Sequence, residues 1–122
     1  MLGAPTPILR SFDEQKTKSF YVDFLAFDVV FEHRFAPDMP LYLGLIKDEC
    51  RLHLSEHFGD ASPGARVRIP SDDVRAFAKS LREKNYENAR PGDAELMEWG
   101  SWEITVHDPS GNRLTFYTET NK

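Results

Sequence analysis

The sequence predicts an α+β fold that consists of two successive modules, each with the element order β-α-β-β-β. Several segments alternate apolar and polar residues, which is typical of strands with one buried face, and two segments repeat apolar residues at helical spacing. The order of these segments in residues 5–56 recurs in residues 64–120. Because 122 residues lie in the size range of one domain, we expect both modules to belong to a single domain over residues 1–122.

A strand and a helix open the first module. Residues 6–10 are expected to form the strand, and Ser11 with Glu14 has the spacing of a capping box at a helix start. We therefore expect a helix from about Asp13 that ends before residue 27. Its apolar residues recur at helical spacing, and they are Phe20, Tyr21, Phe24 and Leu25.

Three further strands complete the first module. Aromatic and β-branched residues predict a strand at residues 27–31, and two more are expected at residues 41–46 and 50–55 after a turn that contains two prolines. Alternation in the last of these strands places Cys50 on the apolar face together with two leucines. The sequence therefore favours an inert, buried thiol over a reactive one.

The second module begins after a loop at residues 57–64 that contains glycine and proline. Residues 66–69 are expected to form its first strand, and Ser71 or Asp72 is expected to cap the helix that follows. This helix has the clearest amphipathic stripe in the chain, which predicts packing against a sheet. The apolar residues of the stripe are Val74, Phe77, Ala78 and Leu81.

The remaining strands of the second module follow this helix. We expect a short strand at residues 86–89 and a turn at residues 90–93. A closing hairpin is expected at the end, with strands at residues 102–107 and 113–117 joined by a turn at residues 108–112 that contains proline and glycine.

Composition argues against several classes of function. Fifteen basic and twenty acidic side chains give a net charge of -5, which opposes the many phosphate contacts of a nucleic acid complex. The single cysteine rules out an intramolecular disulfide and suits a reducing compartment. No apolar run approaches the roughly 20 residues of a membrane span, and the first residues lack the features of a secretory signal. We therefore expect a cytoplasmic protein that binds neither nucleic acid nor membrane.

Two sequence motifs at opposite ends of the chain resemble motifs of one known superfamily. Residues 20–27, FYVDFLAF, are similar to the "FY…LGF" end of the first helix in the vicinal-oxygen-chelate superfamily of glyoxalases, dioxygenases and bleomycin-resistance proteins, although Ala26 replaces the usual glycine. Residues 98–100, EWG, and residues 108–114, DPSGNRL, resemble its "WG…DPxGN" signature. Together with the repeated element order, these motifs identify the chain as similar to the bleomycin-resistance members of the superfamily.

The resemblance implies an architecture and an oligomeric state. In that superfamily two modules form a curved mixed sheet, with the helices on the convex face and the ligand on the concave face. Short members generally form homodimers, so that two equivalent ligand clefts lie at the interface between the subunits. We therefore expect a homodimer that binds a small molecule.

The resemblance also allows the metal site of the superfamily to be checked. Its enzymes hold a divalent metal with His, Glu or Gln side chains on four strands, because the lone pairs of the ligands must converge on one ion. The matching positions in this chain fall near Thr6, His53, Arg66 and Thr115. Only His53 is a credible ligand, and an arginine would repel the metal. We therefore expect no metal, no cofactor and no assigned catalytic residue, and a binding protein is favoured over an enzyme.

Aromatic residues favour binding, because flat rings offer large faces on which a ligand can stack. The tryptophan of resistance-type relatives that matches Trp99 lies beside the bound drug, and the alternative for Trp99 is to close the edge of the core. Trp102 alternates with Ile104 and Val106, which favours a core role over ligand contact. The expected ligand-binding residues are Trp99, His53, Phe35, Tyr42, Trp102 and Arg66.

Two arginines bear on the charge of the ligand. Arg66 and Arg68 alternate with apolar residues and so share one face of a strand. Together with Arg51 they favour an anionic ligand, whereas bleomycin-type drugs are cationic overall. The alternative is that an acid such as Glu32 or Glu103 neutralises the arginines across the sheet.

Three functions remain open at this point. The first is a non-catalytic protein that sequesters a drug or related compound, for which bleomycin is one candidate. The second is a lyase-like or dioxygenase-like enzyme with an altered or absent metal site, in which His53 could act as a base. The third is a dimer that serves mainly as an interaction module.

Overall fold

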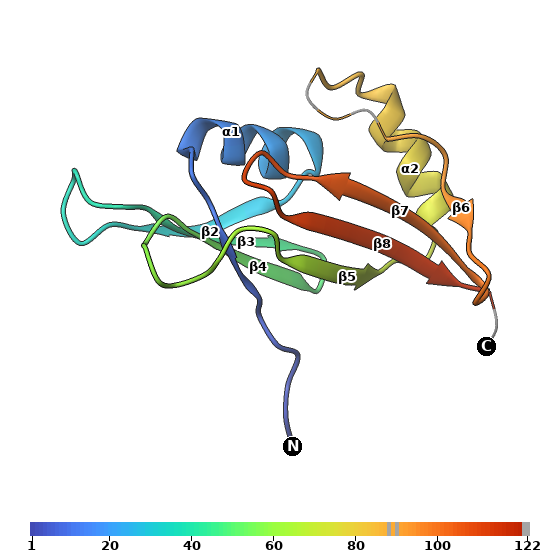
Figure 1. Cartoon of the computed structure of the whole chain (residues 1–122), viewed down its shortest axis with the longest axis horizontal. Helices are drawn as coiled ribbons and strands as arrows, with labels where there is room; N and C mark the ends of the chain where they lie inside the picture. Colours follow the sequence, from blue (N-terminus) through green and yellow to red (C-terminus); the bar gives the residue numbers. More distant parts are fainter. Residues whose placement is uncertain (88, 90, 121–122) are drawn as a thin grey trace. The chain divides into compact units, whose positions relative to one another are not determined.

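The structure of the chain is a computed structural model that describes residues 1–87, 89 and 91–120 (Figure 1). The chain divides into two compact units. Unit 1 comprises Met1–Ala65 and Pro109–Asn112, and unit 2 comprises Arg66–Asp108 and Arg113–Lys122. None of the helices within the described part of the chain is long and apolar enough to cross a membrane.

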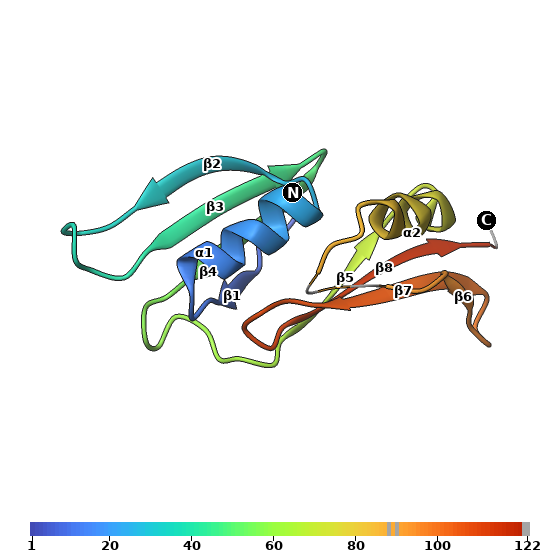
Figure 2. The ribbon, with the colours of Figure 1, turned by 90° about the horizontal axis from the view of Figure 1, so that it is seen from above.

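Unit 1 contains one mixed sheet of four strands and one helical segment. The strand order is β1-β4-β3-β2, with β1 parallel to β4 and the other neighbours antiparallel. The elements are β1 (Ile8–Arg10), α1 (Glu14–Lys18), the π-helical segment η1 (Ser19–Phe24), β2 (Asp28–His33), β3 (Tyr42–Lys47) and β4 (Cys50–Ser55). Figures 1 and 2 show α1 along one face of this sheet. The predicted order of elements is confirmed, and the strand boundaries agree to within two residues.

The start of the first helix differs from the predicted capping box. Asp13 is the cap, and its carboxylate accepts a hydrogen bond from the backbone N–H of Lys16 at 3.0 Å. The hydroxyl of Ser11 is instead 2.7 Å from that of Thr17, and both residues are buried. The capping role of Ser11 was therefore a wrong prediction, because a carboxylate nearer the first turn reaches the free N–H groups.

The first helix then widens into a π-helical turn before it ends. The backbone N–H of Leu25 donates to the carbonyl of Phe20 at 3.0 Å, five residues back along the chain. Ala26 follows with a φ of 64°, the left-handed conformation that glycine adopts most easily. The turn buries three aromatic side chains of the helix, which are Phe20, Tyr21 and Phe24.

The apolar side of the unit 1 sheet is built from alternate residues of three strands. The buried leucines are Leu9 in β1, Leu43 and Leu45 in β3, and Leu52 and Leu54 in β4. Cys50 shares their alternation but lies at the strand end and is only half-buried. Burial raises the pKa of its thiol, and the charge of Asp48 raises it further. The thiol is therefore poorly ionised, as the prediction of an inert cysteine requires.

Unit 2 repeats the same arrangement. Its strand order is β5-β8-β7-β6, with β5 parallel to β8 and the other neighbours antiparallel. The elements are β5 (Arg66–Pro70), α2 (Val74–Glu83), β6 (Glu95–Leu96), β7 (Ser101–His107) and β8 (Arg113–Glu119). The helix packs against β7 and β8, as Figure 2 shows. The α+β class and the β-α-β-β-β order of both modules are thus confirmed, as two four-stranded mixed sheets.

Two local predictions in unit 2 were wrong. Asp73 caps α2, with its carboxylate 3.1 Å from the backbone nitrogen of Ala76, whereas the predicted caps were Ser71 and Asp72. The short strand lies at Glu95–Leu96, where it pairs with β7, and residues 86, 87 and 89 are not in a strand. Positions 88 and 90 of the predicted strand and turn lie outside the described residues.

Candidate functional site

The most exposed tryptophan lies in the turn between β6 and β7. Gly100 closes this turn, with a φ of 89° and a hydrogen bond from its N–H to the carbonyl of Met97 at 3.0 Å. Trp99 is 65% exposed. Its indole Nε1 nevertheless donates a hydrogen bond to Oε2 of Glu103, at 2.9 Å. The ring therefore has a fixed polar edge and a face open to solvent.

Glu103 is a buried carboxylate that three neighbours stabilise. It lies in β7, is 5% exposed, and forms an ion pair with Arg68 of β5 in which Nη2 and Oε2 are 2.8 Å apart. The second guanidinium nitrogen reaches Oε1 at 3.3 Å, and the hydroxyl of Ser101 donates to Oε2 at 2.5 Å. Hydrogen bonding by Arg68, aided by Ser101 and Trp99, lowers the pKa of Glu103 to about 2. The carboxylate is therefore ionised at neutral pH.

Arg68 is itself held in place by an aromatic ring. Its guanidinium lies 4.5 Å from the ring centroid of Tyr117 in β8. The hydrogen bond to Glu103 raises the pKa of Arg68, so that the charge pair is permanent. The sequence alternative in which Glu103 neutralises an arginine across the sheet is thus confirmed for Arg68. Arg66 lies in the same strand and is exposed, and it takes part in none of the ion pairs formed within the described residues.

Unit 1 contains a second aromatic group, on the sheet face opposite the buried leucines. The hydroxyl of Tyr42 and Nδ1 of His53 are 2.9 Å apart. The ring of Phe31 stacks with Tyr42 at a centroid distance of 6.1 Å and meets His53 edge-on at 5.3 Å. Burial raises the pKa of Tyr42, and the charge of Asp60 raises it further. Tyr42 therefore keeps its proton at neutral pH.

Gly44 makes the close packing of this group possible. It lies opposite both Phe31 and His53 in the sheet register. A Cβ at this position would lie 2.2 Å from Cε2 of Phe31, far inside a normal contact distance. The Phe31 ring thus occupies the space above a glycine, and this neighbour of Tyr42 and His53 was not among the predicted residues.

The other predicted residues lie elsewhere in their units. Phe35 follows β2 and is 75% exposed, with its ring edge-on to those of His33 and His57. Trp102 alternates with Glu103 along β7 and so lies on the other face of the sheet, where the guanidinium of Arg75 from α2 is 4.4 Å from its ring centroid. Trp102 and Trp99, two of the predicted residues in unit 2, therefore do not lie together: Trp102 is on the α2 face of the sheet, and Trp99 contacts Glu103 of the opposite face.

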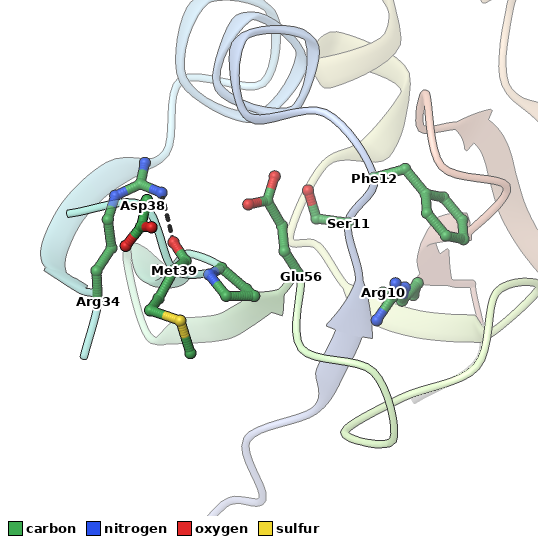
Figure 3. Close-up of a pocket in the computed structure, with 8 residues that line it drawn as sticks. Arg10, Ser11, Phe12, Arg34, Asp38, Met39 and Glu56 are labelled. Carbon is green, nitrogen blue, oxygen red and sulfur yellow. Dashed lines mark hydrogen bonds between the residues drawn. The ribbon is translucent and has the colours of Figure 1, made fainter. Parts of the chain in front are cut away.

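An open hollow in unit 1 contains none of the predicted residues (Figure 3). Its volume is about 360 Å³. The lining residues are Arg10, Ser11, Phe12, Arg34, Asp38, Met39, Pro40 and Glu56. Several of its polar groups already bond to the protein: Arg34 donates to the carbonyl of Met39 at 3.0 Å, and Glu56 accepts from the N–H of Leu41 at 3.1 Å. Few of its polar groups remain to recognise a ligand.

The residues at the expected metal positions do not suit a divalent ion. The hydroxyl of Thr115 lies 2.8 Å from that of Thr105 and is engaged in a hydrogen bond, and Arg66 contributes a positive charge. Within residues 1–87, 89 and 91–120, no three or more His, Cys, Asp or Glu side chains are grouped so as to hold a metal.

Comparison with models of protein families shows to which family the chain belongs. A family model described as "Glyoxalase superfamily protein" matches residues 2–122. The chain belongs to the glyoxalase superfamily. No curated protein sequence matches this glyoxalase-superfamily chain.

Solved structures share the fold of this glyoxalase-superfamily chain over nearly its whole length. TnmS3, an antibiotic-binding protein from Streptomyces sp. CB03234, is 22% identical with a TM-score of 0.77, and 98% of each chain is covered. A bleomycin-binding protein from Streptomyces verticillus, solved with copper(II)-bleomycin, is 26% identical with a TM-score of 0.71 and coverage of 99% and 98%. A bleomycin resistance determinant encoded on transposon Tn5 is 22% identical, with a TM-score of 0.75 and coverage of 98% and 100%. The predicted resemblance to bleomycin-resistance proteins is thereby confirmed.

Proposed function

We propose that this glyoxalase-superfamily chain binds a small aromatic molecule and sequesters it without chemical change, in a cleft at the interface of two subunits. The observation that carries the proposal is the state of Trp99, a residue that is 65% exposed while its Nε1 donates a hydrogen bond to the buried carboxylate of Glu103. A ring held in this way is a stacking platform that loses little conformational freedom when a ligand binds.

The surroundings of Trp99 support a binding role over a structural one. A tryptophan that only filled the core would be buried, and this one exposes most of its ring. Exposed aromatic rings with a fixed orientation gain free energy when a ligand covers them, because apolar surface then leaves water. Glu103 and Arg68 supply the fixed orientation, and their charges largely cancel each other.

Related structures suggest the class of ligand. The Streptomyces verticillus protein binds bleomycin and TnmS3 binds an antibiotic. We infer that the ligand of this chain is a drug or related compound with an aromatic part, and that bleomycin is the first compound to test. A reducing, cytoplasmic setting suits a chain whose single cysteine is half-buried and poorly ionised.

The dimer in this proposal draws support from unit 1. Strand β2 is an edge strand, and all of its residues are exposed. Three of them are large and apolar, namely Val29, Val30 and Phe31. An exposed apolar edge of this kind is unfavourable in a monomer, so we infer that a second copy covers it. A second copy on this edge would also approach the aromatic group of Phe31, Tyr42 and His53 in the same sheet.

Titration of the metal-stripped protein with metal-free bleomycin tests the proposal. Calorimetry gives the stoichiometry, and the variant Trp102→Phe leaves Trp99 as the only tryptophan reporter of fluorescence. We expect saturable binding near one ligand per chain, which Trp99→Ala weakens and Trp102→Phe does not. Failure of bleomycin and of other aromatic antibiotics to bind, together with stoichiometric metal in the untreated protein, would contradict sequestration.

One observation favours an enzyme as the second candidate. The bond between Tyr42 and Nδ1 of His53 can form in either direction. In the tautomer in which Nδ1 carries the proton, Nδ1–H donates a hydrogen bond to the tyrosine oxygen. Nε2 then has a free lone pair and can accept a proton from a substrate. Turnover of a bound compound that His53→Ala abolishes and Tyr42→Phe alters would establish this function in place of sequestration.

A further inference from the structure

The face of the unit 2 sheet opposite α2 carries polar side chains in successive rows across its strands. The register pairs Arg68 of β5 with Thr115 of β8, and Thr115 with Thr105 of β7. The hydroxyls of the two threonines are 2.8 Å apart, and Arg68 reaches Glu103 two residues before Thr105. These contacts place all four side chains on one face, opposite the face on which α2 packs.

The next row across this face is entirely basic. Two residues along each strand, the register pairs Arg66 with Arg113 and Arg113 with His107. Residues two apart in a strand point to the same side. Arg66, Arg113 and His107 therefore stand side by side on the face that carries Glu103, and we call them the basic row.

The basic row has no acidic counterpart among the described residues. Arg68 is neutralised by Glu103, whereas none of the ion pairs formed within the described part of the chain includes Arg66, Arg113 or His107. Arg66 and His107 are exposed and Arg113 is partly exposed. Like charges directly opposite each other in a sheet are destabilising. The chain carries a net charge of -5, yet none of the acids in the described ion pairs lies against this row.

Two arginines and a histidine in one row have the donors that an oxyanion requires. Each guanidinium offers a planar fork of N–H groups, and a neutral or charged imidazole always keeps at least one N–H donor. From Glu103 to His107 the strand advances by about 13 Å at the usual rise per residue. A drug-sized molecule can therefore span the distance between the basic row and Glu103, the carboxylate that holds Trp99.

We propose that Arg66, Arg113 and His107 bind an oxyanion of the ligand, a carboxylate, sulfate or phosphate group, while its aromatic part stacks on Trp99. This inference rests on the proposed function and narrows it: the ligand carries a ring at one end and an anionic group at the other. The row disfavours a purely cationic compound as the preferred ligand, because such a compound would meet two guanidinium groups that are permanently charged and have no acceptor. Bleomycin, which is cationic overall, should therefore bind more weakly than an anionic aromatic compound.

Three matched probes test the charge of the ligand. Dansyl-aminohexanoate has an aromatic ring and a carboxylate at the end of a flexible chain, its methyl ester is neutral, and dansylcadaverine ends in a cation. Their binding is followed by dansyl fluorescence. We expect the carboxylate to bind about tenfold tighter than the ester, as charge-assisted hydrogen bonds allow, and the cation to bind most weakly.

Charge-neutral variants locate the effect. Arg66→Gln and Arg113→Gln should each reduce the advantage of the carboxylate over the ester. Arg75→Gln removes the same charge on the α2 side, where Arg75 lies over Trp102, and should leave the advantage intact. Equal binding of carboxylate and ester, or tighter binding of the cation, would overturn the inference.

The outcome separates this inference from the proposed function. The ester could bind in a way that Trp99→Ala weakens, while the carboxylate binds no more tightly than the ester. That result would support the stacking function and refute the anion site. If no dansyl probe binds, the protein is titrated with inorganic sulfate and followed by NMR. Saturable shifts of the side-chain N–H signals of Arg66 and Arg113 would support the site. Absence of those shifts refutes it.

Discussion

The indole N–H of Trp99 donates a hydrogen bond to the carboxylate of Glu103, with the two heavy atoms 2.9 Å apart. Trp99 lies in a tight turn and is 65% exposed, whereas Glu103 lies in the strand that follows and is 5% exposed. Glu103 connects this exposed ring to Arg68 in another strand. The orientation of Trp99 thus depends on a charge pair within the sheet.

Substitution of the tryptophan tests whether its ring is a platform. Trp99→Ala should weaken ligand binding by roughly 1 to 3 kcal/mol, as expected for the loss of a stacking surface. The fold should survive, because most of the ring is already in water. Calorimetric titration measures the affinity, and circular dichroism checks the fold. Collapse of the folded state in this variant would assign Trp99 to the core instead.

Substitution of the acid tests whether the platform is held in place. Glu103→Gln removes the ion pair with Arg68 and weakens the bond to the indole, so stability should fall by about 1–3 kcal/mol, the range for hydrogen bonds to charged groups. Trp99 should also gain mobility, which time-resolved fluorescence anisotropy in the Trp102→Phe background measures. The control is Glu95→Gln, at an exposed carboxylate paired with Glu103 in the register of β6 and β7. Unchanged anisotropy in Glu103→Gln would show that the turn alone holds the ring.

Stability should depend on pH through Glu103. Its pKa is about 2 in the folded protein and 4.5 when unperturbed, chiefly because Arg68 stabilises the charged form. A depressed pKa stabilises the folded state above the unperturbed value, and this contribution is lost as pH falls from about 4.5 towards 2. Urea unfolding between pH 7 and 2.5 should show a smaller acid-induced loss in Glu103→Gln than in the native protein. Some loss should remain, because Lys18 and Arg34 also lower the pKa of Glu14.

The glycine beneath Phe31 gives a test in unit 1. A Cβ at position 44 would lie 2.2 Å from the Phe31 ring, so Gly44→Ala must displace that ring or strain the sheet. We expect a loss of about 1–3 kcal/mol, as for overpacked sites, measured by denaturant unfolding. Phe31→Ala removes the clash, so the double variant should be more stable than the sum of the two single losses predicts. Strict additivity would show that Phe31 does not occupy this space.

Local residue patterns sufficed for much of the fold. Alternation located β4 at residues 50–55 without error, and the stripe of α2 predicted both the helix and its packing on a sheet. Caps were missed by one or two residues in both helices, because Ser11, Asp13, Ser71, Asp72 and Asp73 are all suitable cap residues and only the folded backbone selects among them. The short strand β6 was missed because its two residues pair with β7 and carry no periodic signal of their own.

The candidate site was predicted only in part. The tryptophan in the EWG phrase and the alternation of Arg66 and Arg68 were visible in the sequence. Glu103 was one of two acids named as possible partners of the arginines, but the choice between them requires the register of β5, β8 and β7. The bond between Glu103 and Trp99 was not predicted. Phe31 was missed because the glycine that accommodates its ring is thirteen residues further along the chain.

The α+β class, the repeated element order and the apolar faces could all be predicted from residue patterns, because they depend on residue spacing within a single strand or helix. Tertiary structure alone decided which charges meet. Arg68 pairs with Glu103 while Arg66 stands beside Arg113 and His107, although both arginines belong to the same face of the same strand. That difference arises from strand register, which brings together residues far apart in the chain and which hydrogen bonding across the sheet fixes only in the folded protein.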